Sequence, residues 1–404
     1  MRLAEACGLA EALDLDVARA EIAPLRRAQP GMLFGAGRVD ALKEAVDEEH
    51  AGVIVIDHLV SPVQQRNLEK ALNAKVIDRT GLILEIFGRR AQTREGRLQV
   101  ELARLGYEKS RLVRTWTHLE RQRGGLGNIG GPGETQLETD RRLLDKRIIK
   151  LKRDLDEVRR TRGLQRSARR RAGLPAIVLV GYTNAGKSSL FNRLTAAGVL
   201  AKDMPFATLD PTARLVKMPS RRDVVMADTV GFISDLPTEL VAAFRATLEA
   251  VTEADVLIHV RDVAHPETEK QRADVEAVLK RLMHDAGHER PPLIEVWNKI
   301  DLLDPERRAA RESRAPQSGA LMLSAVTGDG IEALRDAIDI AAYGHLQIID
   351  VTLDLSDGAE HAWIAAHGRI LEERSDDGVL RVKAELPAPD AARLLQRHGP
   401  THAD

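Results

Sequence analysis

The sequence predicts a multidomain α/β protein, and three observations support that fold class. With 404 residues the chain is too long for one ordinary hydrophobic core, so two to four domains are expected. Helix-like and strand-like stretches alternate along most of it, which is typical of parallel sheets covered by helices. A glycine-containing turn at residues 181–188 stands between an apolar run and a helix-forming stretch, which is the context of a phosphate-binding loop.

Composition limits the class of protein. The chain is 43% hydrophobic and 30% charged, as in soluble globular proteins, and its longest apolar run, around 174–180, is far short of the roughly 20 residues that cross a bilayer. Residues 1–13 lack the continuous apolar region of a secretory signal. The single cysteine, Cys7, excludes internal disulfides and suits a reducing compartment. We expect a cytoplasmic monomer, with peripheral membrane association left open.

Residues 1–92 are predicted to form a small N-terminal α/β domain. Its helical patterns lie at 2–13, 39–49 and 61–72, and its strand-like patterns at 15–22, 52–57 and 74–78. The short turn at 35–38 contains two glycines, and a plain turn is a better interpretation than a ligand site. No catalytic set is visible in this domain.

Residues 93–172 are predicted to form an antiparallel coiled-coil hairpin. Apolar residues recur there at alternating spacings of four and three along two stretches, without a gap in the second and with Lys109 at the missing step in the first. They are Leu98, Leu102, Leu105, Leu112, Trp116 and Leu119, then Leu144, Ile148, Leu151, Leu155 and Val158. The connector at 124–134 is too rich in glycine to be helical and too long for a minimal turn, which favours a functional tip.

The second helix of this hairpin is strongly basic. Residues 141–171 hold fourteen Lys and Arg against four acids, a difference of ten positive charges. So large an excess on one element repels itself unless a polyanion balances it, although a charge run is more often a solvated helix face. We expect nucleic acid as the partner, and folded RNA above all, because few aromatic residues are present to stack on single strands.

Residues 173–342 contain the nucleotide-binding motifs. Gly181, four residues, Gly186, Lys187 and Ser188 match the phosphate-loop pattern in full. Backbone N–H groups of the loop are expected to surround phosphate, Lys187 to reach the outer phosphates and Ser188 to offer its hydroxyl to Mg2+. The predicted loop contacts are Gly181, Tyr182, Thr183, Asn184, Ala185, Gly186, Lys187, Ser188 and Ser189.

A second motif follows an apparent hairpin of residues 213–218 and 223–227. Asp228-Thr229-Val230-Gly231 stands at the end of its second strand. An aspartate at a strand terminus can hold Mg2+ through water, and the glycine lets its backbone N–H approach a γ-phosphate. Lys187 and Gly231 are therefore predicted to take part in catalysis.

Two further strand ends carry a base-recognition pattern. Asn298-Lys299-Ile-Asp301 follows the strand at 293–296, and Ser324-Ala325 follows the strand at 321–323. A buried Asp301 carboxylate would accept hydrogen bonds from N1–H and the amino group of guanine, a donor pair that adenine lacks. Asn298 and Lys299 would brace and cover the base, and the Ser324-Ala325 turn would contact the carbonyl of the base. These motifs in this order predict a P-loop GTPase domain, with a mostly parallel sheet and helices on both faces.

Two positions affect the expected mechanism. Phe232 stands where Ras-like proteins place the glutamine that orients the attacking water, so slow intrinsic hydrolysis is expected, with the water positioned by another residue, a cation or a partner. Asn184 matches the asparagine of potassium-activated relatives, where it helps to hold a K+ ion beside the phosphates. A role for Asn184 in stabilising the turn is equally compatible with the sequence.

Residues 345–404 are predicted to form a small C-terminal α/β domain without a catalytic constellation. The patterns indicate a strand at 347–355, a helix at 359–373 and a strand at 379–386. The last residues, 400–404, are expected to fray.

The whole chain resembles the HflX family of ribosome-associated GTPases. The resemblance rests on residues 59–72 (LVSPVQQRNLEKAL), 78–87 (DRTGLILEIF), 89–93 (RRAQT), 130–142 (GGPGETQLETDRR) and 206–212 (FATLDPT), besides the nucleotide motifs. The segment around Gly133-Glu134-Thr135 is far more specific than the phosphate loop. Relatives generally carry a strand before the first helix, and here Met1 opens almost directly into the helical stretch.

The resemblance implies a GTP-dependent factor that binds the large ribosomal subunit and, in some members, splits stalled or stress-inactivated ribosomes. It also implies that Thr208, in the segment Phe206-Ala207-Thr208, coordinates Mg2+ in the GTP state, which makes it a third catalytic candidate. The metal ligands are then Ser188, Thr208 and Asp228. Two alternatives are an RNA-binding assembly factor that uses GTP as a checkpoint, and a purine triphosphatase with relaxed specificity and a second nucleotide site in the N-terminal domain.

Overall fold

The structure is a computed structural model of the chain. It describes residues 2–25, 27–122, 132–196, 205–206, 208, 212–233, 245–287, 289–344, 346–354, 358–376 and 378–398. The predicted connector at 124–134 lies mostly outside these ranges, as do Ala207, the tail at 400–404 and the side chains of Leu112, Trp116 and Leu119.

By its internal contacts the chain divides into two units. The first consists of Met1–Gln165, Lys202–Asp210 and Ile233–Thr247, and the second of Arg166–Ala201, Pro211–Phe232 and Leu248–Asp404. Within the described residues, no helix is both long and apolar enough to cross a membrane.

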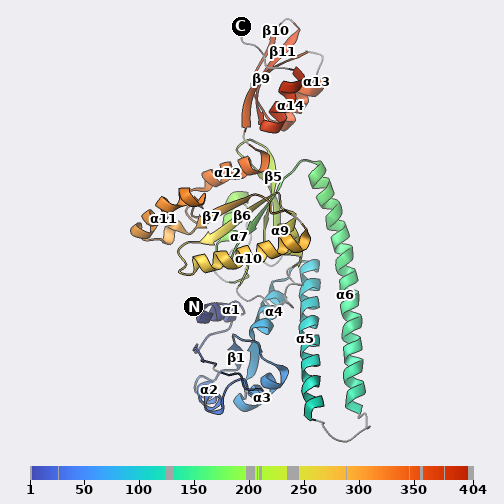
Figure 1. The fold of residues 1–404 in the computed structure, drawn as a ribbon, viewed down its shortest axis with the longest axis vertical. Helices are drawn as coiled ribbons and strands as arrows, with labels where there is room; N and C mark the ends of the chain where they lie inside the picture. Colours follow the sequence, from blue (N-terminus) through green and yellow to red (C-terminus); the bar gives the residue numbers. More distant parts are fainter. Residues whose placement is uncertain are drawn as a thin grey trace. The chain divides into compact units, whose positions relative to one another are not determined.

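The first unit contains a small α/β domain and two long helices (Figure 1). Its elements are α1 (Arg2–Glu11), α2 (Ala36–Glu48), β1 (Val53–Ile56), α3 (Pro62–Leu72), β2 (Lys75–Asp78), α4 (Arg79–Arg90), α5 (Arg94–Gln122) and α6 (Pro132–Arg171), of which α6 continues into the second unit. Strands β1 and β2 pair in parallel, with Val53 opposite Lys75. Helix α3 begins at the predicted place because Ser61 and Gln64 form a reciprocal capping box.

The predicted strand at residues 15–22 is wrong. This segment has neither helix nor strand, and Ile22 is 75% exposed. Apolar residues alternate there as in a strand, but in the described part of this domain β1 and β2 pair only with each other, so no ladder supports the segment. Helix α4, which was not predicted from the sequence, is buried on most sides, because every residue from Leu82 to Phe87 except Glu85 is apolar and buried.

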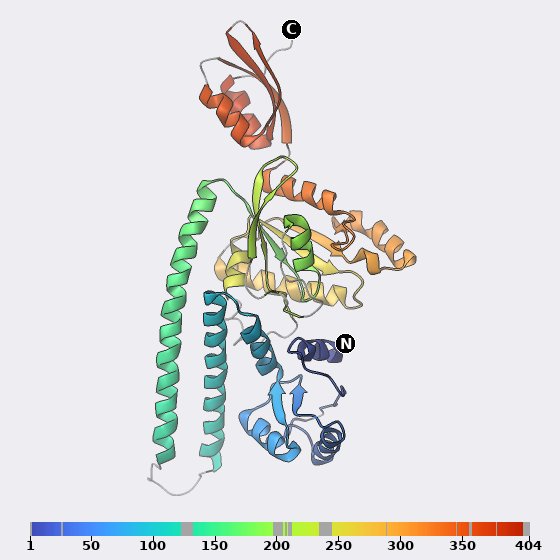
Figure 2. The same ribbon diagram turned by 180° about the vertical axis from the view of Figure 1, so that it is seen from behind.

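Helices α5 and α6 lie side by side and run antiparallel, as predicted (Figures 1 and 2). Ion pairs join Glu95 to Arg162 at 2.8 Å and Glu101 to Arg147 at 2.5 Å, and Lys109 pairs with Asp145. Along these three ion pairs the residue numbers rise on α5 and fall on α6, so the two helices run in opposite directions. Leu151 and Leu155 of the predicted seam are buried.

Helix α5 is tied to the small domain through Asp78. This buried carboxylate caps α4 by accepting the Gly81 N–H at 2.7 Å, accepts the Tyr107 hydroxyl at 2.8 Å and pairs with Arg111 at 3.3 Å. Burial and the adjacent Asp78 carboxylate raise the pKa of Tyr107. The middle of α5 is thus held against the small domain by a hydrogen-bonded network and not by packing alone.

The second unit contains a six-stranded sheet in the order β4-β5-β3-β6-β7-β8. Its elements are β3 (Ala176–Val180), α7 (Lys187–Thr195), β4 (Thr212–Lys217), β5 (Asp223–Asp228), α9 (Arg245–Thr252), β6 (Val256–Asp262), α10 (Thr268–Ala286), β7 (Leu293–Asn298), η1 (Ile300–Leu302), α11 (Pro305–Ser318), β8 (Leu321–Met322) and α12 (Ile331–Tyr343), of which α9 begins in the first unit. Every neighbouring pair is parallel except β4 with β5. One apolar cluster of the sheet contains residues of α7 and α12, and a second cluster contains residues of α9 and α10. The prediction of a mostly parallel sheet covered on both faces is confirmed.

The C-terminal part is also α/β, but its predicted elements need correction. It contains β9 (Leu346–Asp354), α13 (Gly358–His367), β10 (Arg369–Asp376), β11 (Val379–Pro387) and α14 (Ala388–His398), with antiparallel strands in the order β10-β11-β9. The predicted helix at 359–373 ends at His367. Its last residues form β10, because Gly368 lies so close to β11 that a Cβ would be 2.4 Å from the Glu385 carbonyl oxygen.

A buried histidine on β6 makes this sheet sensitive to acid. His259 is 1% exposed, and its Nδ1 has no hydrogen-bond partner among the described residues. Burial lowers its pKa from 6.5 to about 4; Glu295 opposes this shift, and Arg261, Arg290 and Arg272 add to it. The imidazole is therefore neutral in the folded protein at pH 7.

We predict that His259→Gln reduces the loss of stability in acid. Between pH 6.5 and about 4 the unfolded chain binds a proton that the folded chain does not, so this group lowers the unfolding free energy by about 2 kcal/mol at pH 5. Urea denaturation at pH 7.5 and pH 5 measures the loss in parent and variant. His284→Gln, at an exposed position, is the control, and equal losses in parent and His259→Gln would contradict the assignment.

Candidate functional site

The phosphate loop lies where the pattern predicts, between β3 and α7. All five residues of β3 are buried, and α7 begins at Lys187. Gly186 has a φ of 91°, and a Cβ there would be 2.2 Å from Asn298 Nδ2. Only glycine permits this approach. The loop backbone is therefore fixed against the strand end that carries Asn298, with its N–H groups at the start of a helix, where anions are stabilised.

Lys187 is buried within the loop. Its Nζ donates a hydrogen bond to the Tyr182 carbonyl at 2.7 Å. Burial lowers its pKa to about 8; Asp228 opposes this shift, and Lys299 adds to it. A Cβ on Gly231 would be 2.8 Å from Lys187 Nζ and 2.6 Å from Thr183 Cα. The structure thus places three predicted residues, Thr183, Lys187 and Gly231, in contact distance of one another.

Phe232 joins this loop through its backbone. Its N–H donates to the Gly181 carbonyl at 3.0 Å, and its carbonyl accepts the Thr183 N–H at 2.7 Å. The Phe232 side chain is buried in the apolar cluster that also holds Val180 and Tyr182. An apolar side chain in that place cannot orient a water molecule by hydrogen bonding, and slow intrinsic hydrolysis stays a prediction.

Oxygen ligands for a divalent cation meet beside the loop. Ser188 Oγ donates to Asp228 Oδ2 at 2.6 Å, so a hydroxyl and a carboxylate lie together at the ends of α7 and β5. Hard oxygen donors suit Mg2+, and this pair fits it. Next to Asp228, Thr229 Oγ1 donates to the Leu179 carbonyl at 2.6 Å, and Val230 is buried. These contacts hold the 228–231 segment beside β3.

Phe206 and Thr208 belong to the first unit. The Phe206 ring contacts Phe87 of α4 edge to face, with centroids 4.8 Å apart, and it is buried there. Ala207, between them, is outside the described residues. The expected role of these three residues in binding nucleotide or Mg2+ stays a prediction.

Asn298 joins the phosphate loop to the loop after β8. Its Nδ2 donates to the Ala185 carbonyl at 2.9 Å, and its Oδ1 accepts the Ala325 N–H at 3.0 Å. The next residue, Lys299, has a left-handed φ of 67°, and its Nζ lies 2.9 Å from Asp262 Oδ2. Asp262, at the carboxyl end of β6, therefore fixes the direction of the lysine that is predicted to cover the base.

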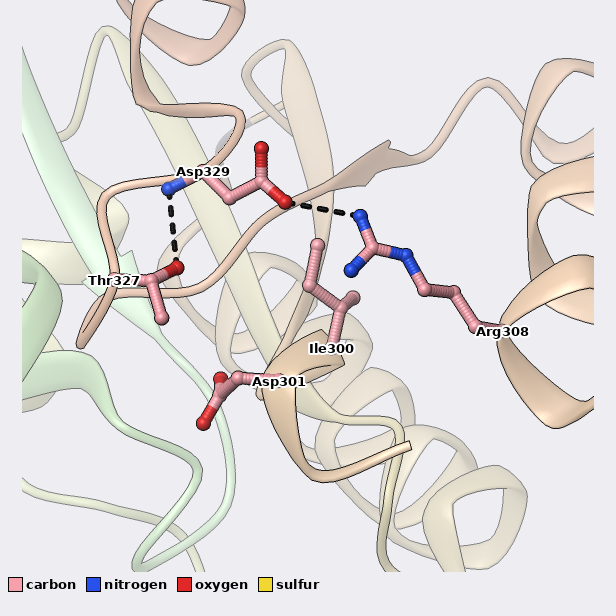
Figure 3. A pocket seen from close by; sticks show the side chains of 5 residues that line it. All are labelled: Ile300, Asp301, Arg308, Thr327 and Asp329. Atoms are coloured by element: carbon pink, nitrogen blue, oxygen red, sulfur yellow. Dashed lines mark hydrogen bonds and ion pairs between the residues drawn. The ribbon is translucent and has the colours of Figure 1, made fainter. Parts of the chain in front are cut away.

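Asp301 lines a pocket of about 450 Å³ (Figure 3). The pocket is lined by Ile300, Asp301, Arg308, Thr327 and Asp329. Asp301 is exposed, so the expectation of a buried carboxylate is wrong: it follows Lys299 in a short surface 3-10 turn, η1. On the other side of the pocket Arg308 pairs with Asp329 at 2.9 Å. Asp301 nevertheless remains available to accept two hydrogen bonds from a base.

Three other predicted contact residues lie in turns or at the start of a helix. Asn184 is exposed, with a φ of 61°, a conformation that asparagine tolerates better than most residues. This supports the turn-stabilising interpretation, while the K+ site stays a prediction. Ser189 lies in the first turn of α7. Ser324 accepts the Thr327 N–H at 3.1 Å through its Oγ and thereby shapes the loop.

Four residues near the site were missed. Asp262 stands at a strand end between known motifs, so the rule that ligands bind at the carboxyl ends of parallel strands would have found it. Arg193, Arg308 and Asp329 lie in helices or loops outside any short motif, and only their contacts reveal them. Nothing in their sequence spacing distinguishes them from surface residues.

Four family models match successive parts of the chain. They are "GTP-binding GTPase N-terminal" at residues 1–88, "GTP-binding GTPase Middle Region" at 90–169, "50S ribosome-binding GTPase" at 176–299 and "HflX C-terminal domain" at 310–403. Together they span nearly the whole sequence.

Full-length relatives are similar at high identity. The GTPase HflX of Magnetococcus marinus is 48% identical over 98% of this chain and 91% of its own length, and that of Escherichia coli K12 is 44% identical over 91% and 85%. A solved GTP-binding protein from Sulfolobus solfataricus in complex with GDP is 26% identical, over 84% of this chain and 94% of that one, with a TM-score of 0.45.

Proposed function

The chain belongs to the HflX family of GTPases, and we propose that it hydrolyses GTP at the site built from residues 181–189, 228–231, 298–301 and 324–325 while bound to the large ribosomal subunit. The observation that carries the site is the pair of Asn298 hydrogen bonds, because they unite the phosphate loop with the base loop. A nucleotide requires both loops at a fixed separation.

Each part of the site has a chemical task. Backbone N–H groups of the loop and Lys187 stabilise the negative charge of the phosphates, and the Gly231 N–H binds the γ-phosphate. Ser188 and Asp228, whose side chains are hydrogen-bonded to each other, would hold Mg2+. When bound, Mg2+ neutralises the charge that develops on the transferred phosphoryl group.

Intrinsic hydrolysis is slow in this proposal. Phe232 packs in the core and offers no polar group to the attacking water. The ribosome then completes the site by positioning the water or by stabilising the 228–232 segment in its active arrangement. GTP turnover is coupled in this way to the presence of the target.

The helical hairpin, residues 93–172, is the proposed ribosome-binding arm. Several basic residues of α6 are exposed: Arg141, Lys146, Lys150, Lys152, Arg153 and Arg160. Some of the other basic residues, such as Arg147 and Arg162, are neutralised by ion pairs with α5. The exposed set supplies a binding surface for ribosomal RNA through phosphate contacts.

Ribosome splitting or rescue is the proposed outcome of binding, with the GTP state favouring attachment and hydrolysis favouring release. The second candidate function is that of an assembly factor, which would use the same basic arm to bind the RNA of immature ribosomal particles. The two differ in target: a splitting factor releases subunits from stalled 70S ribosomes, whereas an assembly factor associates with subunit precursors. Sedimentation of the purified protein with each kind of particle separates them.

We predict that Asp301→Asn changes the base preference from guanine to xanthine. The asparagine amide donates to the xanthine 2-oxygen and still accepts from N1–H, but it loses the second bond from the guanine amino group. We expect the variant's affinity for GDP to fall by about 100-fold and its affinity for xanthosine diphosphate (XDP) to exceed its affinity for GDP. Fluorescence titrations with labelled nucleotides measure both affinities. An unchanged preference for GDP would remove Asp301 from the base site.

We also predict that the triple variant Lys146→Glu, Lys150→Glu, Arg153→Glu loses most of the stimulation of GTP hydrolysis by large ribosomal subunits. Its rate without ribosomes stays at the parent value, because the changes lie on α6. Raising the salt concentration from about 50 to about 200 mM should also weaken the stimulation of the parent, because salt weakens the same contacts between basic side chains and phosphates.

The matched control reverses the same number of charges on α10, with Lys270→Glu, Lys280→Glu and Arg281→Glu. This variant should keep the parent's stimulation. If both triple variants lose stimulation equally, general charge attracts the ribosome and the hairpin is not the arm.

A further inference from the structure

Arg193, near the end of α7, contacts the base loop through two backbone carbonyls. Its Nε donates to the Ala325 carbonyl at 3.1 Å, and its Nη2 donates to the Val326 carbonyl. The phosphate loop begins α7 and Arg193 lies in its last turn, so this one helix contributes to both ends of the nucleotide site. No motif used to recognise the nucleotide includes Arg193.

These contacts determine where one backbone donor points. In a trans peptide the C=O of one residue and the N–H of the next point in opposite directions within one plane. Since Arg193 holds the Ala325 carbonyl, it turns the Val326 N–H away from α7. Asn298 and Ser324 bind the N–H groups on either side, those of Ala325 and Thr327, but neither holds the peptide plane between Ala325 and Val326.

Val326 carries the available donor of this loop. Among the backbone N–H groups of residues 324–329, that of Val326 alone has no acceptor within the part of the chain that the structure describes. The others bind the Asp329 carbonyl, Asn298 Oδ1, Ser324 Oγ, the Ser324 carbonyl and Thr327 Oγ1. Val326 is also 72% exposed. A donor held in a fixed direction beside the base residues is suited to a carbonyl acceptor on a ligand.

We propose that Arg193 is a positioning residue for guanine recognition, which orients the Val326 N–H toward the 6-oxygen of the base. The inference rests on the proposed nucleotide site. The positive charge of Arg193 also polarises the peptide group between Ala325 and Val326. This strengthens the hydrogen bond that the Val326 N–H donates on the opposite side of that peptide group. Arg193 itself does not touch the nucleotide.

The test compares three diphosphates that differ at the base. GDP has the 6-oxygen and the 2-amino group, IDP keeps the 6-oxygen but lacks the amino group, and 2-aminopurine riboside diphosphate lacks the 6-oxygen. Arg193→Gln should weaken GDP and IDP by about fivefold each and leave the 2-aminopurine nucleotide at the parent affinity. Arg193→Lys, which keeps the charge and can reach one carbonyl, should fall between.

Controls separate the alternatives. Arg281→Gln, which removes an exposed arginine from α10, should leave all three affinities unchanged. The inference is overturned if Arg193→Gln leaves GDP binding unchanged, or if it weakens all three nucleotides equally, as a general disturbance of the loop would. Asp301→Asn tests the site itself. If this variant binds GDP with the parent's affinity, the proposed site fails. If Asp301→Asn weakens GDP binding but Arg193→Gln does not, only the role of Arg193 is removed.

Discussion

Two hydrogen bonds from one buried amide hold the nucleotide site together. Asn298 is 1% exposed at the end of β7, and its side chain binds Ala185 in the phosphate loop and Ala325 in the base loop. Leaving either partner unsatisfied inside the protein would cost about 1–3 kcal/mol, which is more than a typical hydrogen bond contributes. Gly186 is required for the same reason, since only a residue without a side chain leaves room for this amide.

The sheet order explains why such distant segments meet. Strands β5, β3, β6 and β7 are parallel neighbours, so their carboxyl ends lie along one edge. Asp228, Asp262 and Asn298 are the last residues of β5, β6 and β7, and the phosphate loop directly follows β3. The chemistry of the site therefore depends on strand order and register, and the loops need only the residues that finish each strand.

The nucleotide motifs could be predicted because each is local, as when residues 181–188 form one turn whose backbone geometry demands its glycines. The failures concern properties that depend on distant partners. Residues 369–373 favour a helix locally, but Gly368 and pairing with β11 make them a strand. Residues 15–22 alternate like a strand without a neighbour to pair with. Asp301 lies on a surface turn, and Arg193 acts through a loop more than a hundred residues away.

The most direct test of the account is the GDP affinity of Asn298→Asp. Aspartate has the same shape and keeps the acceptor for the Ala325 N–H, but it replaces the donor to Ala185 with an oxygen facing a carbonyl. We expect the GDP dissociation constant to rise at least about 100-fold while the circular dichroism spectrum stays native. A folded variant that binds GDP as tightly as the parent would contradict the claim that this amide holds the site together.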